Sequence, residues 1–504
     1  MTLGELLEGI EIVAARGTLE MSVQGLAYDS RRVRPGDVFF ALSGSKQDGR
    51  GFAREAQAAG AVAIVGSGLD AAGDGVVSVS EPRRALAQAS ARFHGYPART
   101  LRIAGVTGTN GKTTTTWMLT SIFRAAGVSP GLIGTIAYRI GDESRAAPFT
   151  TPEAPELQAL LREMNDRGVR MVAMEVSSHA LVQRRAYGVE FDAVVFTNLT
   201  QDHLDYHGDM EHYLDAKLML FDGRNGPSTK RATAIVWVDD PAGRRVVAAA
   251  EQAGLRVVTV GSELTSGPQA SRLDVSVGRI ESRPDGLALQ LFVDLRGTRM
   301  GETLVWLPLL GRFNAANAAL AVATAAVLGI DVRTIVRSLE AMSGVPGRLE
   351  RVEAGQPWLV VVDYAHTPDA LERALAAVRE HVRGRVSLVF GCGGDRDSGK
   401  RPQMGRIAAR DADRAWVTND NPRGEDPAAI ARAIMAGDET GRLVLQLDRR
   451  AAIAESLAAA RPGDAVLIAG KGHETTQTIG DRVLPFDDRA VARELLAARG
   501  TGSP

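Results

Sequence analysis

The chain has 504 residues, of which 45% are hydrophobic and 24% are charged, as in ordinary globular proteins. Its formal net charge of −1 argues against a protein that binds nucleic acid or an anionic membrane through overall charge, so we expect neither partner. One cysteine, Cys392, allows no disulfide within the chain, and Met1–Glu11 carries no basic-then-apolar leader. These features predict a cytoplasmic protein, and the length predicts roughly three domains.

The first 98 residues are expected to form a small α/β domain of their own. Short buried strands are predicted at Val38–Leu42 and Ala61–Val65, and helices at Phe52–Ala59 and Pro82–Phe93. Strands that alternate with helices are typical of an α/β layer structure. We therefore place the first domain at residues 1–98.

A glycine-rich loop, Gly105–Thr115, opens the second domain. An apolar segment, Leu101–Val106, predicts a strand before the loop, and the residues from about Thr113 to Ala126 predict a helix after it. Strand, glycine loop, Lys-Thr and helix are the context of a phosphate-binding loop. A glycine-rich turn that carries an exposed lysine is the alternative.

Within this loop, Lys112 is expected to reach the β- and γ-phosphates of a nucleotide and the Thr113 hydroxyl to bind Mg²⁺. The spacing departs from the strict pattern, because Val106 stands where the first glycine belongs and Gly105 lies one residue earlier. The context nevertheless favours a nucleotide site.

The second domain is expected to span residues 99–343 and to contain a parallel, P-loop-type sheet. A β-rich stretch, Leu273–Leu309, predicts an antiparallel extension, and the alanine-rich segment Ala315–Ile330 predicts a buried helix too short to cross a bilayer comfortably. The predicted strands after the loop are Met171–Val176, Ala193–Thr197 and Ala234–Val238.

The third domain is expected to span residues 344–504. Helices such as Asp369–Val382 and Pro427–Met435 are predicted between its strands, which resembles a doubly wound, Rossmann-like sheet. No G-x-G-x-x-G follows a strand, so no dinucleotide site is expected. The predicted strands are Leu359–Val362, Val386–Phe390, Ala415–Thr418, Leu443–Gln446 and Ala465–Ile468.

Polar residues gather where two strands of the second domain are predicted to end, and ligands of open parallel sheets bind at such ends. Glu175 lies at the end of an apolar strand and offers Mg²⁺ a hard oxygen ligand, although a structural ion pair is the alternative. The stretch Thr197–Gly208 is dense in His and Asp. It permits a zinc site, a surface loop or, as we favour, a second divalent cation bound by His203.

Lys217 is a single lysine among apolar residues of the predicted helix Tyr213–Phe221. An exposed lysine is the usual explanation. A lysine that loses its proton can instead react with CO₂ to give a carbamate, which converts a cation into an anionic metal ligand.

Seven motifs in order resemble the Mur ligase family over essentially the whole chain. The motifs are Gly105–Thr114, Glu175–His179, Thr197–Gly208, Ala216–Lys217, Gly311–Asn317, Gly347–Glu350 and Asp363–Pro368. The resemblance implies three domains that bind, in order, the UDP end of a substrate, ATP, and an amino acid. The displaced glycine at Gly105 is also this family's form of the loop.

The resemblance implies ATP and Mg²⁺ as cofactors and a monomeric enzyme. It implies catalytic roles for Lys112, Glu175, His203 and Lys217. Metal ligands would be Thr113, Glu175, His203 and a carbamylated Lys217. The ATP contacts would be Gly108, Thr109, Asn110, Gly111, Lys112, Thr113, Thr114, Asn314, Asn317, Arg348 and Asp363.

Two further residue sets are implied for the other substrates. A UDP-linked muramoyl-peptide would be bound by Ser30, Thr150, Thr151, Ser177, Gln183 and Arg185. The loop Ser45–Lys46–Gln47 and Phe149 depart from some relatives, which puts their contacts in doubt. An amino acid, meso-diaminopimelate, would be bound by Arg396, Asp420, Asn421, Pro422, Arg423, Gly470 and Glu474.

The motif Asp420–Arg423 is the marker for diaminopimelate in this resemblance, because relatives that add lysine lack the arginine. The chemistry agrees, since the far end of diaminopimelate carries a carboxylate, and an Arg guanidinium binds a carboxylate through two hydrogen bonds. Asp420 and Glu474 would hold ammonium groups. Without the resemblance, the motif is typical of a turn before a helix.

The expected activity is an ATP-dependent amide ligase of peptidoglycan synthesis that joins meso-diaminopimelate to the D-Glu of UDP-N-acetylmuramoyl-L-Ala-D-Glu through an acyl phosphate. A lysine-adding ligase of the same family and a folylpolyglutamate synthase-like ligase are rivals. Arg423 is the main argument against a lysine-adding ligase. The roughly one hundred residues before the phosphate loop argue against a folylpolyglutamate synthase-like ligase. A P-loop switch without ligase activity is the rival from another class.

Overall fold

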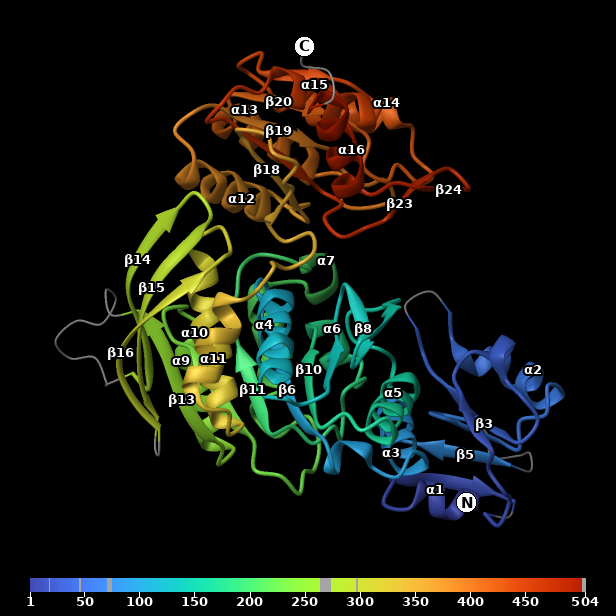
Figure 1. The fold of residues 1–504 in the computed structure, drawn as a ribbon. Helices are drawn as coiled ribbons and strands as arrows, with labels where there is room; N and C mark the ends of the chain where they lie inside the picture. Colours follow the sequence, from blue (N-terminus) through green and yellow to red (C-terminus); the bar gives the residue numbers. More distant parts are fainter. Residues whose placement is uncertain (18, 45–46, 70–74, 263–272, 296–297, 501–504) are drawn as a thin grey trace. The chain divides into compact units, whose positions relative to one another are not determined.

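The structure, a computed structural model, describes residues 1–17, 19–44, 47–69, 75–262, 273–295 and 298–500 (Figure 1). Contacts divide the chain into two compact units, and each is described by itself. Unit 1 comprises residues 1–275, 294–299 and 320–335, and unit 2 comprises residues 276–293, 300–319 and 336–504.

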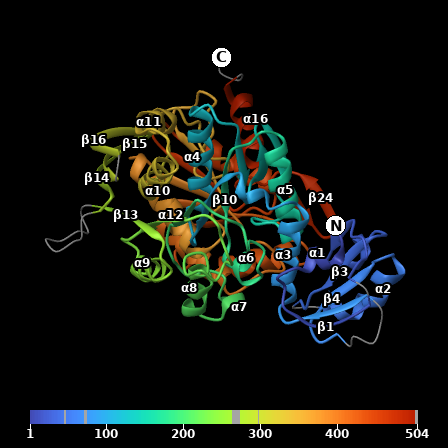
Figure 2. The same ribbon diagram turned by 90° about the horizontal axis from the view of Figure 1, so that it is seen from below.

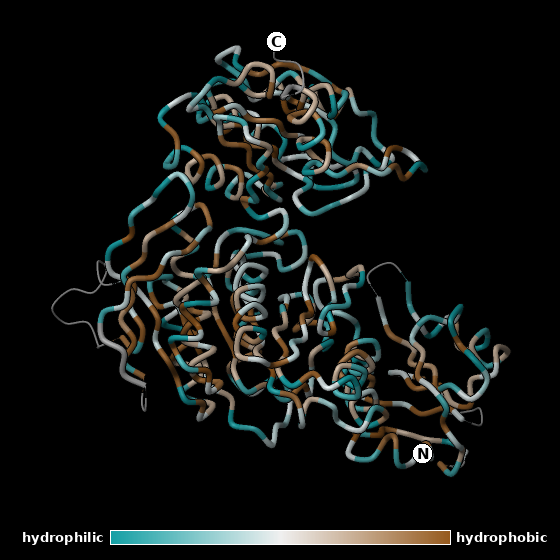
Figure 3. Tube along the Cα trace, viewed as in Figure 1, coloured by the Kyte–Doolittle hydropathy of each residue, from teal (hydrophilic) through white to brown (hydrophobic). Residues whose placement is uncertain are grey.

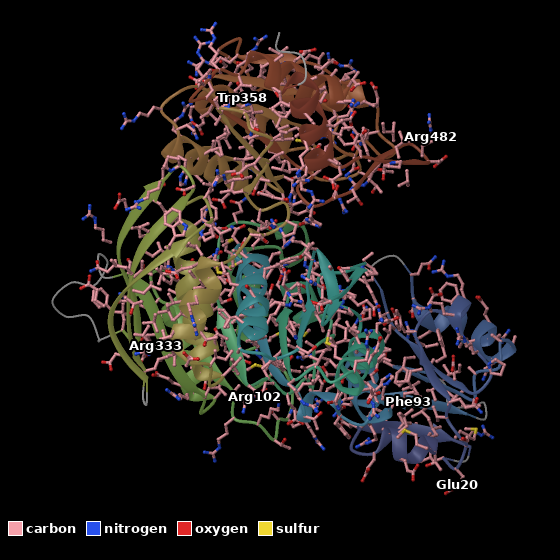
Figure 4. The ribbon with its side chains drawn as sticks, in the orientation of Figure 1. Glu20, Phe93, Arg102, Arg333, Trp358 and Arg482 are labelled. Atoms are coloured by element: carbon pink, nitrogen blue, oxygen red, sulfur yellow. The ribbon has the colours of Figure 1, made fainter. Side chains whose placement is uncertain are left out.

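A five-stranded sheet forms the N-terminal part of unit 1, where the sequence predicts a small α/β fold with two of these strands. Its order is β1-β5-β4-β3-β2, in which β2 to β5 run parallel and β1 is antiparallel to β5. The predicted helix Pro82–Phe93 is confirmed with the same bounds as α3, and Phe93 ends it (Figure 4). The other elements are α1 (Leu3–Leu7), β1 (Ile12–Arg16), β2 (Gly25–Ala27), β3 (Asp37–Ala41), α2 (Ala53–Ala58), β4 (Ala63–Gly66) and β5 (Val76–Val79).

The central sheet of unit 1 confirms the predicted parallel P-loop-type arrangement. Its strands follow the order β13-β12-β11-β6-β10-β7-β8-β9, parallel from β13 to β7 and antiparallel at β8 and β9. They are β6 (Arg102–Thr107), β7 (Pro130–Ile133), β8 (Ala137–Ile140), β9 (Glu143–Ala146), β10 (Met171–Glu175), β11 (Ala193–Phe196), β12 (Thr233–Trp237) and β13 (Arg256–Ser262).

Helices cover this sheet because parallel strands need crossover connections, which are usually helical. Helix α4 lies over β6 and β10 (Figure 1), and α3 and α5 lie side by side (Figure 2). The central strands β6, β10 and β11 are buried on both faces and hydrophobic (Figure 3), which makes their sequences nearly continuous apolar runs. The helices are α4 (Lys112–Ala125), α5 (Ala154–Asp166), α6 (Ser178–Val182), α7 (Leu204–His207), α8 (Met210–Leu218) and α9 (Gly243–Gln252).

The predicted β-rich extension consists of long strands that lie mostly in unit 2: β14 (Val275–Arg283), β15 (Gly286–Leu295) and β16 (Thr298–Leu307). Strands β14 and β15 are neighbours joined by residues 284–285 alone, and so short a connection makes them antiparallel. The predicted alanine-rich helix follows as α10 (Phe313–Val327), and α11 (Val332–Glu340) comes after it.

The C-terminal part of unit 2 is the predicted doubly wound sheet. Its order is β17-β18-β22-β19-β20-β21, and all strands except β17 run parallel. One apolar core contains residues of α12, α13 and α14, and a separate core contains residues of α15 and α16, so helices cover both faces. The strands are β17 (Glu350–Arg351), β18 (Leu359–Asp363), β19 (Val386–Phe390), β20 (Arg414–Val417), β21 (Leu443–Leu445) and β22 (Ala465–Ala469).

The remaining elements of unit 2 are its helices and a small hairpin. The hairpin consists of β23 (Thr476–Ile479) and β24 (Arg482–Pro485), which pair antiparallel. The helices are α12 (Pro368–His381), α13 (Lys400–Asp411), α14 (Pro427–Met435), α15 (Arg449–Ala459) and α16 (Asp488–Gly500).

The five-stranded, the central and the doubly wound sheet lie on successive parts of the chain, which agrees with the expected three-domain architecture. The boundaries at residues 98/99 and 343/344 stay predictions, because the two compact units divide the chain differently. Of the helices that the structure describes, none is long and apolar enough to cross a membrane.

A fully buried ion pair joins α15 to α16. The Arg449 guanidinium donates from Nε and Nη2 to the two carboxylate oxygens of Asp488 at 2.8 and 2.7 Å, and both side chains are 0% exposed. Arg449 also donates to the carbonyls of Asn419 and Ala469, at the ends of β20 and β22. The pair therefore anchors two strand ends as well as two helices.

We expect Asp488→Asn to lower the free energy of unfolding by about 3–5 kcal/mol, because it leaves the Arg449 charge buried without its counter-ion. The control is Glu494→Gln, which breaks the exposed pair Arg450–Glu494 between the same two helices. Denaturant titration of both variants measures the difference. Equal stability of the two variants would show that the buried pair is not a stability determinant.

Candidate functional site

The predicted phosphate loop connects β6 to α4 in unit 1. Gly108 and Gly111 have φ angles of +146° and +87°, in the region that favours glycine, and a Cβ on Gly108 would lie 1.8 Å from Thr197 Oγ1. Thr113 and Thr114 lie in the first turn of α4, where backbone N–H groups at the positive end of the helix dipole face outward. The loop therefore has the features of an anion-binding loop.

The displaced glycine, Gly105, lies inside β6 rather than in the loop. A Cβ at this position would meet the Phe191 ring at 2.6 Å. Gly105 thus serves the packing of the sheet, and the loop depends on Gly108 and Gly111.

The segment after β11 supports the phosphate loop. Asn198 accepts from the backbone N–H groups of Thr109 and Asn110, each at 2.9 Å, through its carbonyl and its side-chain oxygen. Thr197 and Asn198 in turn donate to the Asn110 carbonyl at 2.6 and 3.1 Å. The Lys112 ammonium donates to the carbonyls of Gly108 and Thr109 at 2.8 and 2.7 Å, so this side chain lies along the loop.

Glu175 is a fully buried carboxylate at the end of β10, beside this loop. Its Oε2 accepts from the hydroxyls of Thr113 and Thr135, each at 3.0 Å, and its Oε1 accepts from the Thr135 backbone N–H at 2.9 Å. Thr135 was not predicted as a site residue. It follows β7, so the rule that ligands bind at strand ends is the signal that could have identified it.

The predicted peptide-binding residues Thr150, Thr151, Ser177, Gln183 and Arg185 join the same network. Thr150 and Thr135 share a hydroxyl hydrogen bond of 3.0 Å, and Thr151 donates to the Glu175 carbonyl at 2.9 Å. Ser177 N donates to the Thr151 hydroxyl, and the Arg185 guanidinium donates to the Thr151 carbonyl and the Gln183 side chain.

The remaining residues discussed for the UDP-linked substrate are Ser30, the loop Ser45–Lys46–Gln47 and Phe149. Ser30 is buried in a 3₁₀ turn, Ser30–Arg32, and no contact that the structure gives for its described residues joins it to the Thr151 network. Ser45 and Lys46 lie outside the described residues. Phe149 is half-exposed, and its ring lies 5.1 Å from the Arg185 guanidinium.

His203 and Lys217 gather around Tyr213, a buried residue of α8 that was not predicted as part of the site. The Lys217 Nζ lies 4.2 Å from the centroid of the Tyr213 ring, and the His203 and Tyr213 ring centroids are 6.1 Å apart. The Tyr213 hydroxyl lies 3.2 Å from Thr109 Oγ1 of the phosphate loop. Tyr213 thus connects these two residues to the loop.

Burial lowers the pKa values of Lys217, His203 and His179. The Lys217 side chain is 1% exposed, and burial, with the nearby Lys112 charge, lowers the pKa of its ammonium well below that of a free lysine. Burial also lowers the pKa of His203, and lowers that of His179 to about 4. Lys217 is therefore not the exposed lysine of the usual explanation.

Mg²⁺ prefers oxygen ligands, and the buried Glu175 carboxylate and the Thr113 hydroxyl offer them beside the phosphate loop. The hydrogen bonds to the Glu175 side chain come from neutral donors, which leaves its charge for a cation. The donor set fits a magnesium ion. Among the described residues, no three His, Cys, Asp or Glu side chains lie close enough to form a metal site by themselves.

In unit 2, the predicted nucleotide residues Asn314 and Asn317 lie one turn apart on α10, and both are buried. Asn317 donates to the Asn314 side-chain oxygen at 2.8 Å. Asp363 accepts from the backbone N–H groups of Leu349 and Ala365 at 2.7 and 2.8 Å, and burial raises the pKa of its carboxyl.

Tyr364 lies among the predicted nucleotide and amino-acid contacts of unit 2. The Arg348 guanidinium lies 4.8 Å from its ring centroid, and the His473 ring lies 5.0 Å from it. Burial raises the pKa of Tyr364, and the charges of Glu474, Arg348, Asp420 and Arg396 also act on it. Sequence reasoning missed Tyr364, although it stands inside one of the motifs.

The loops after β19 and β20 are bonded to each other. Gly394 N donates to the Asn421 carbonyl at 2.9 Å, and the Arg423 guanidinium donates to the Gly394 carbonyl at 2.8 Å. Asp420 is 8% exposed, and its Oδ2 has no hydrogen-bond partner within the described chain. A Cβ on Gly470 would lie 2.4 Å from that oxygen, so Gly470 leaves it room.

These features define an α/β protein whose central sheet carries a phosphate loop and whose C-terminal sheet is doubly wound. Family models of the Mur ligases match three parts of the chain. The catalytic domain model of the family matches residues 22–94, the middle domain matches residues 106–325, and the glutamate ligase domain matches residues 347–472. The chain belongs to the Mur ligase family.

Two curated relatives extend the likeness over nearly the whole chain. Both are named UDP-N-acetylmuramoyl-L-alanyl-D-glutamate–2,6-diaminopimelate ligase. The protein from Geobacillus kaustophilus is 45% identical over 482 residues, with 95% of this chain and 96% of the relative covered. The protein from Streptomyces avermitilis is 44% identical over 494 residues, with 96% and 94% covered.

Solved structures agree with the fold. A diaminopimelate ligase of the same name is 32% identical, covers 99% of both chains and superposes with a TM-score of 0.70. A folylpolyglutamate synthase of Mycobacterium tuberculosis has a TM-score of 0.59 at 20% identity, with 84% of this chain and 96% of that chain covered. The second likeness shows the fold alone.

We expect the half-buried His473 to make the stability of the chain depend on pH. Burial is the main cause that lowers its pKa to about 4, against about 6.5 for an unfolded histidine. Between these values the unfolded state binds more protons than the folded state, so stability falls as the pH is lowered from 7 to 5. The contribution over this interval is roughly 2 kcal/mol.

We therefore expect His473→Gln to lose less stability than the unchanged protein between pH 7 and pH 5. Denaturant titrations at the two pH values measure the difference, and His212→Gln, on the exposed surface, is the control. An identical pH dependence of His473→Gln and the unchanged protein would contradict the burial of a neutral imidazole.

Proposed function

We propose that this chain is an ATP-dependent amide ligase that joins meso-diaminopimelate to the D-Glu of UDP-N-acetylmuramoyl-L-Ala-D-Glu in cytoplasmic peptidoglycan precursor synthesis. The observation that carries the proposal is identity of 41–46% to curated diaminopimelate ligases that match at least 95% of the chain. The loop that contains Asp420 and Arg423, which is bonded to the loop after β19 at Gly394, supports the choice of amino acid.

In the proposed reaction, the D-glutamyl carboxylate attacks the γ-phosphorus of ATP in line. A bond forms between the carboxylate oxygen and phosphorus, the bond to the β-phosphate oxygen breaks, and ADP leaves. The amine of diaminopimelate then attacks the acyl carbon, loses a proton, and expels phosphate. Activation is needed because a carboxylate is a poor acyl donor.

The phosphate loop supplies positive electrostatic potential where the transferred group carries negative charge. Lys112 would turn from the loop carbonyls to the phosphate oxygens, and the N–H groups of the loop and of α4 would bind them. Bound Mg²⁺ supplies charge neutralisation to the phosphates. Thr113 and Glu175 would hold it directly or through water, with His203 and a carbamate on Lys217 beside them.

The other predicted residues divide by substrate. Thr150, Thr151, Ser177, Gln183 and Arg185 are proposed to bind the muramoyl-peptide, which their common network with Glu175 supports. Ser30 is proposed to contact the UDP end. For ATP in unit 2 we propose Asn314, Asn317, Arg348 and Asp363, and for diaminopimelate Arg396, Asp420, Asn421, Pro422, Arg423, Gly470 and Glu474.

Arg423 and Asp420 give the amino-acid site its proposed selectivity. An Arg guanidinium binds a carboxylate through two parallel hydrogen bonds, and diaminopimelate has a carboxylate at the end where lysine has none. The Asp420 Oδ2 that lacks a hydrogen-bond partner is an acceptor for an ammonium group. We also propose that the enzyme works as a monomer.

The test is phosphate release from ATP and Mg²⁺ in the presence of UDP-N-acetylmuramoyl-L-Ala-D-Glu, with meso-diaminopimelate, L-lysine or no amino acid. We expect release and a peptide product with diaminopimelate alone. A preference for lysine would keep the family and overturn the substrate. An equal rate of ATP hydrolysis with diaminopimelate, with lysine and without an amino acid would indicate a nucleotide switch or another acceptor.

The same assay tests Arg423. Arg423→Ala removes the bidentate partner of the distal carboxylate, so we expect the preference for diaminopimelate over lysine to fall by at least about tenfold. An unchanged preference would refute this role.

A carbamate on Lys217 is tested by ¹³C NMR of the protein in ¹³C-bicarbonate. Burial lowers the pKa of the Lys217 ammonium, which raises the fraction of neutral amine that can react with CO₂. We expect one protein-bound carbamate resonance, which disappears in Lys217→Ala and remains in Lys230→Ala, a control lysine paired with Asp192. No difference between the two variants would exclude Lys217 as the site.

A further inference from the structure

Lys471 has a completely buried side chain in unit 2, and the reaction proposed above gives it no role. It follows β22 between Gly470 and Gly472, whose φ angles are +112° and +53°. A Cβ on Gly472 would lie 2.7 Å from Tyr364 Cβ, and one on Gly470 would lie 2.4 Å from Asp420 Oδ2. The two glycines let this loop pack closely against the amino-acid site.

The Lys471 ammonium meets three acceptors. It donates to Glu474 Oε2 at 3.0 Å, to the Thr476 carbonyl at 2.5 Å and to Asn421 Oδ1 at 3.4 Å. Burying an ammonium group is costly unless it is both paired and hydrogen-bonded. The three contacts satisfy both conditions, so the lysine and its partners constrain one another.

Asn421 connects Glu474 to the hairpin that begins at Thr476. Its side-chain amide donates to Glu474 Oε2 at 2.8 Å, and its side-chain oxygen accepts from Thr478 N at 2.9 Å. Within the described chain, the hydrogen bonds to the Glu474 carboxylate all reach Oε2, which leaves Oε1 for another donor. The Glu474 side chain is 30% exposed, so that donor can come from solution.

Beside the network, the buried Asp420 has no ion-pair partner among the described residues. Arg449 and Asp488 neutralise each other as a buried pair, and Lys471 pairs with Glu474. Asp420 remains, buried and with an oxygen that lacks a hydrogen-bond partner among the described residues. An ammonium group of an incoming amino acid would give this oxygen a hydrogen-bond donor.

We propose that Lys471 is a positioning residue of the amino-acid site. It does not touch the substrate; it holds the Glu474 carboxylate and the Asn421 amide in one arrangement, with Glu474 Oε1 directed to the ammonium group of the acceptor amino acid. This proposal rests on the proposed function, and it deepens the account of how diaminopimelate is bound.

The experiment uses the full-length enzyme and measures KM separately for diaminopimelate, ATP and the UDP-linked substrate. We expect Lys471→Met to raise KM for diaminopimelate by roughly 10- to 100-fold, the value of a hydrogen bond to a charged group. The other two KM values should stay within about twofold. Arg482→Met, which removes an exposed positive charge from the neighbouring hairpin (Figure 4), is the control and should leave all three unchanged.

A double-mutant cycle separates positioning from general support of the fold. If Lys471 acts through Glu474, then Lys471→Met adds little to the KM of Glu474→Gln. Additive effects of the two substitutions, or equal rises of all three KM values, would overturn the proposal. Lys471→Gln keeps a donor group, and we expect it to retain more affinity than Lys471→Met; if the methionine variant does not fold, the cycle is run with glutamine.

The unchanged enzyme in the same assay separates a failure of the proposed function from a failure of the proposed role of Lys471. If it shows no diaminopimelate-dependent turnover, the proposed function fails, and the role of Lys471 falls with it. If it turns over normally and Lys471→Met is not selective for diaminopimelate, the inference on Lys471 alone fails.

Discussion

The buried Glu175 carboxylate is the interaction on which the site of unit 1 depends. It receives hydrogen bonds from the first turn of α4 through Thr113 and from the end of β7 through Thr135. A buried carboxylate is tolerated only where hydrogen bonds or a cation compensate its lost hydration. The carboxylate therefore requires the helix and the strand ends to converge, and the same convergence places it beside the phosphate loop.

In unit 2, buried charged side chains likewise lie at the ends of strands. Asp420 follows β20, Lys471 follows β22, and Arg449 bonds the carbonyls at the ends of both strands. A buried ion pair seldom adds net stability over well-packed apolar side chains of similar volume. The presence of charged side chains at these positions is better explained by the need to present charged groups in a fixed arrangement to a charged amino acid.

The sequence predicts the buried parallel strands well, because a strand covered on both faces must be a continuous apolar run. Strand Val386–Phe390 and helices Pro82–Phe93 and Pro427–Met435 have the predicted bounds. Edge strands were missed: β1 and β9 are mostly or fully exposed and therefore lack an apolar pattern. Strand β1 pairs with β5, far along the chain, so local sequence does not identify it, whereas β9 pairs with the adjacent β8 in a hairpin.

The same reasoning explains which site residues could be predicted. Lys112, Thr113 and Glu175 stand in motifs whose chemistry is visible in the sequence. Thr135, Tyr213 and Lys471 each have a partner that only the fold brings close, namely Glu175, Thr109 and Asn421. Lys471 lies in a Gly-Lys-Gly stretch that looks like an exposed turn until Asn421 and Glu474 are seen around it.

Gly105 shows that a match to a sequence pattern does not establish why a residue is present. The strict phosphate-loop pattern asks for a glycine at the position of Val106, and the nearby glycine invites the conclusion that the loop has merely shifted. The glycine is instead required by the Phe191 ring, which leaves no room for a Cβ on β6. The loop takes its own conformational freedom from Gly108 and Gly111, where φ is positive. A motif is therefore best judged by the backbone conformation and the space that each of its positions requires. A glycine that lies one position away can be required by a different physical constraint.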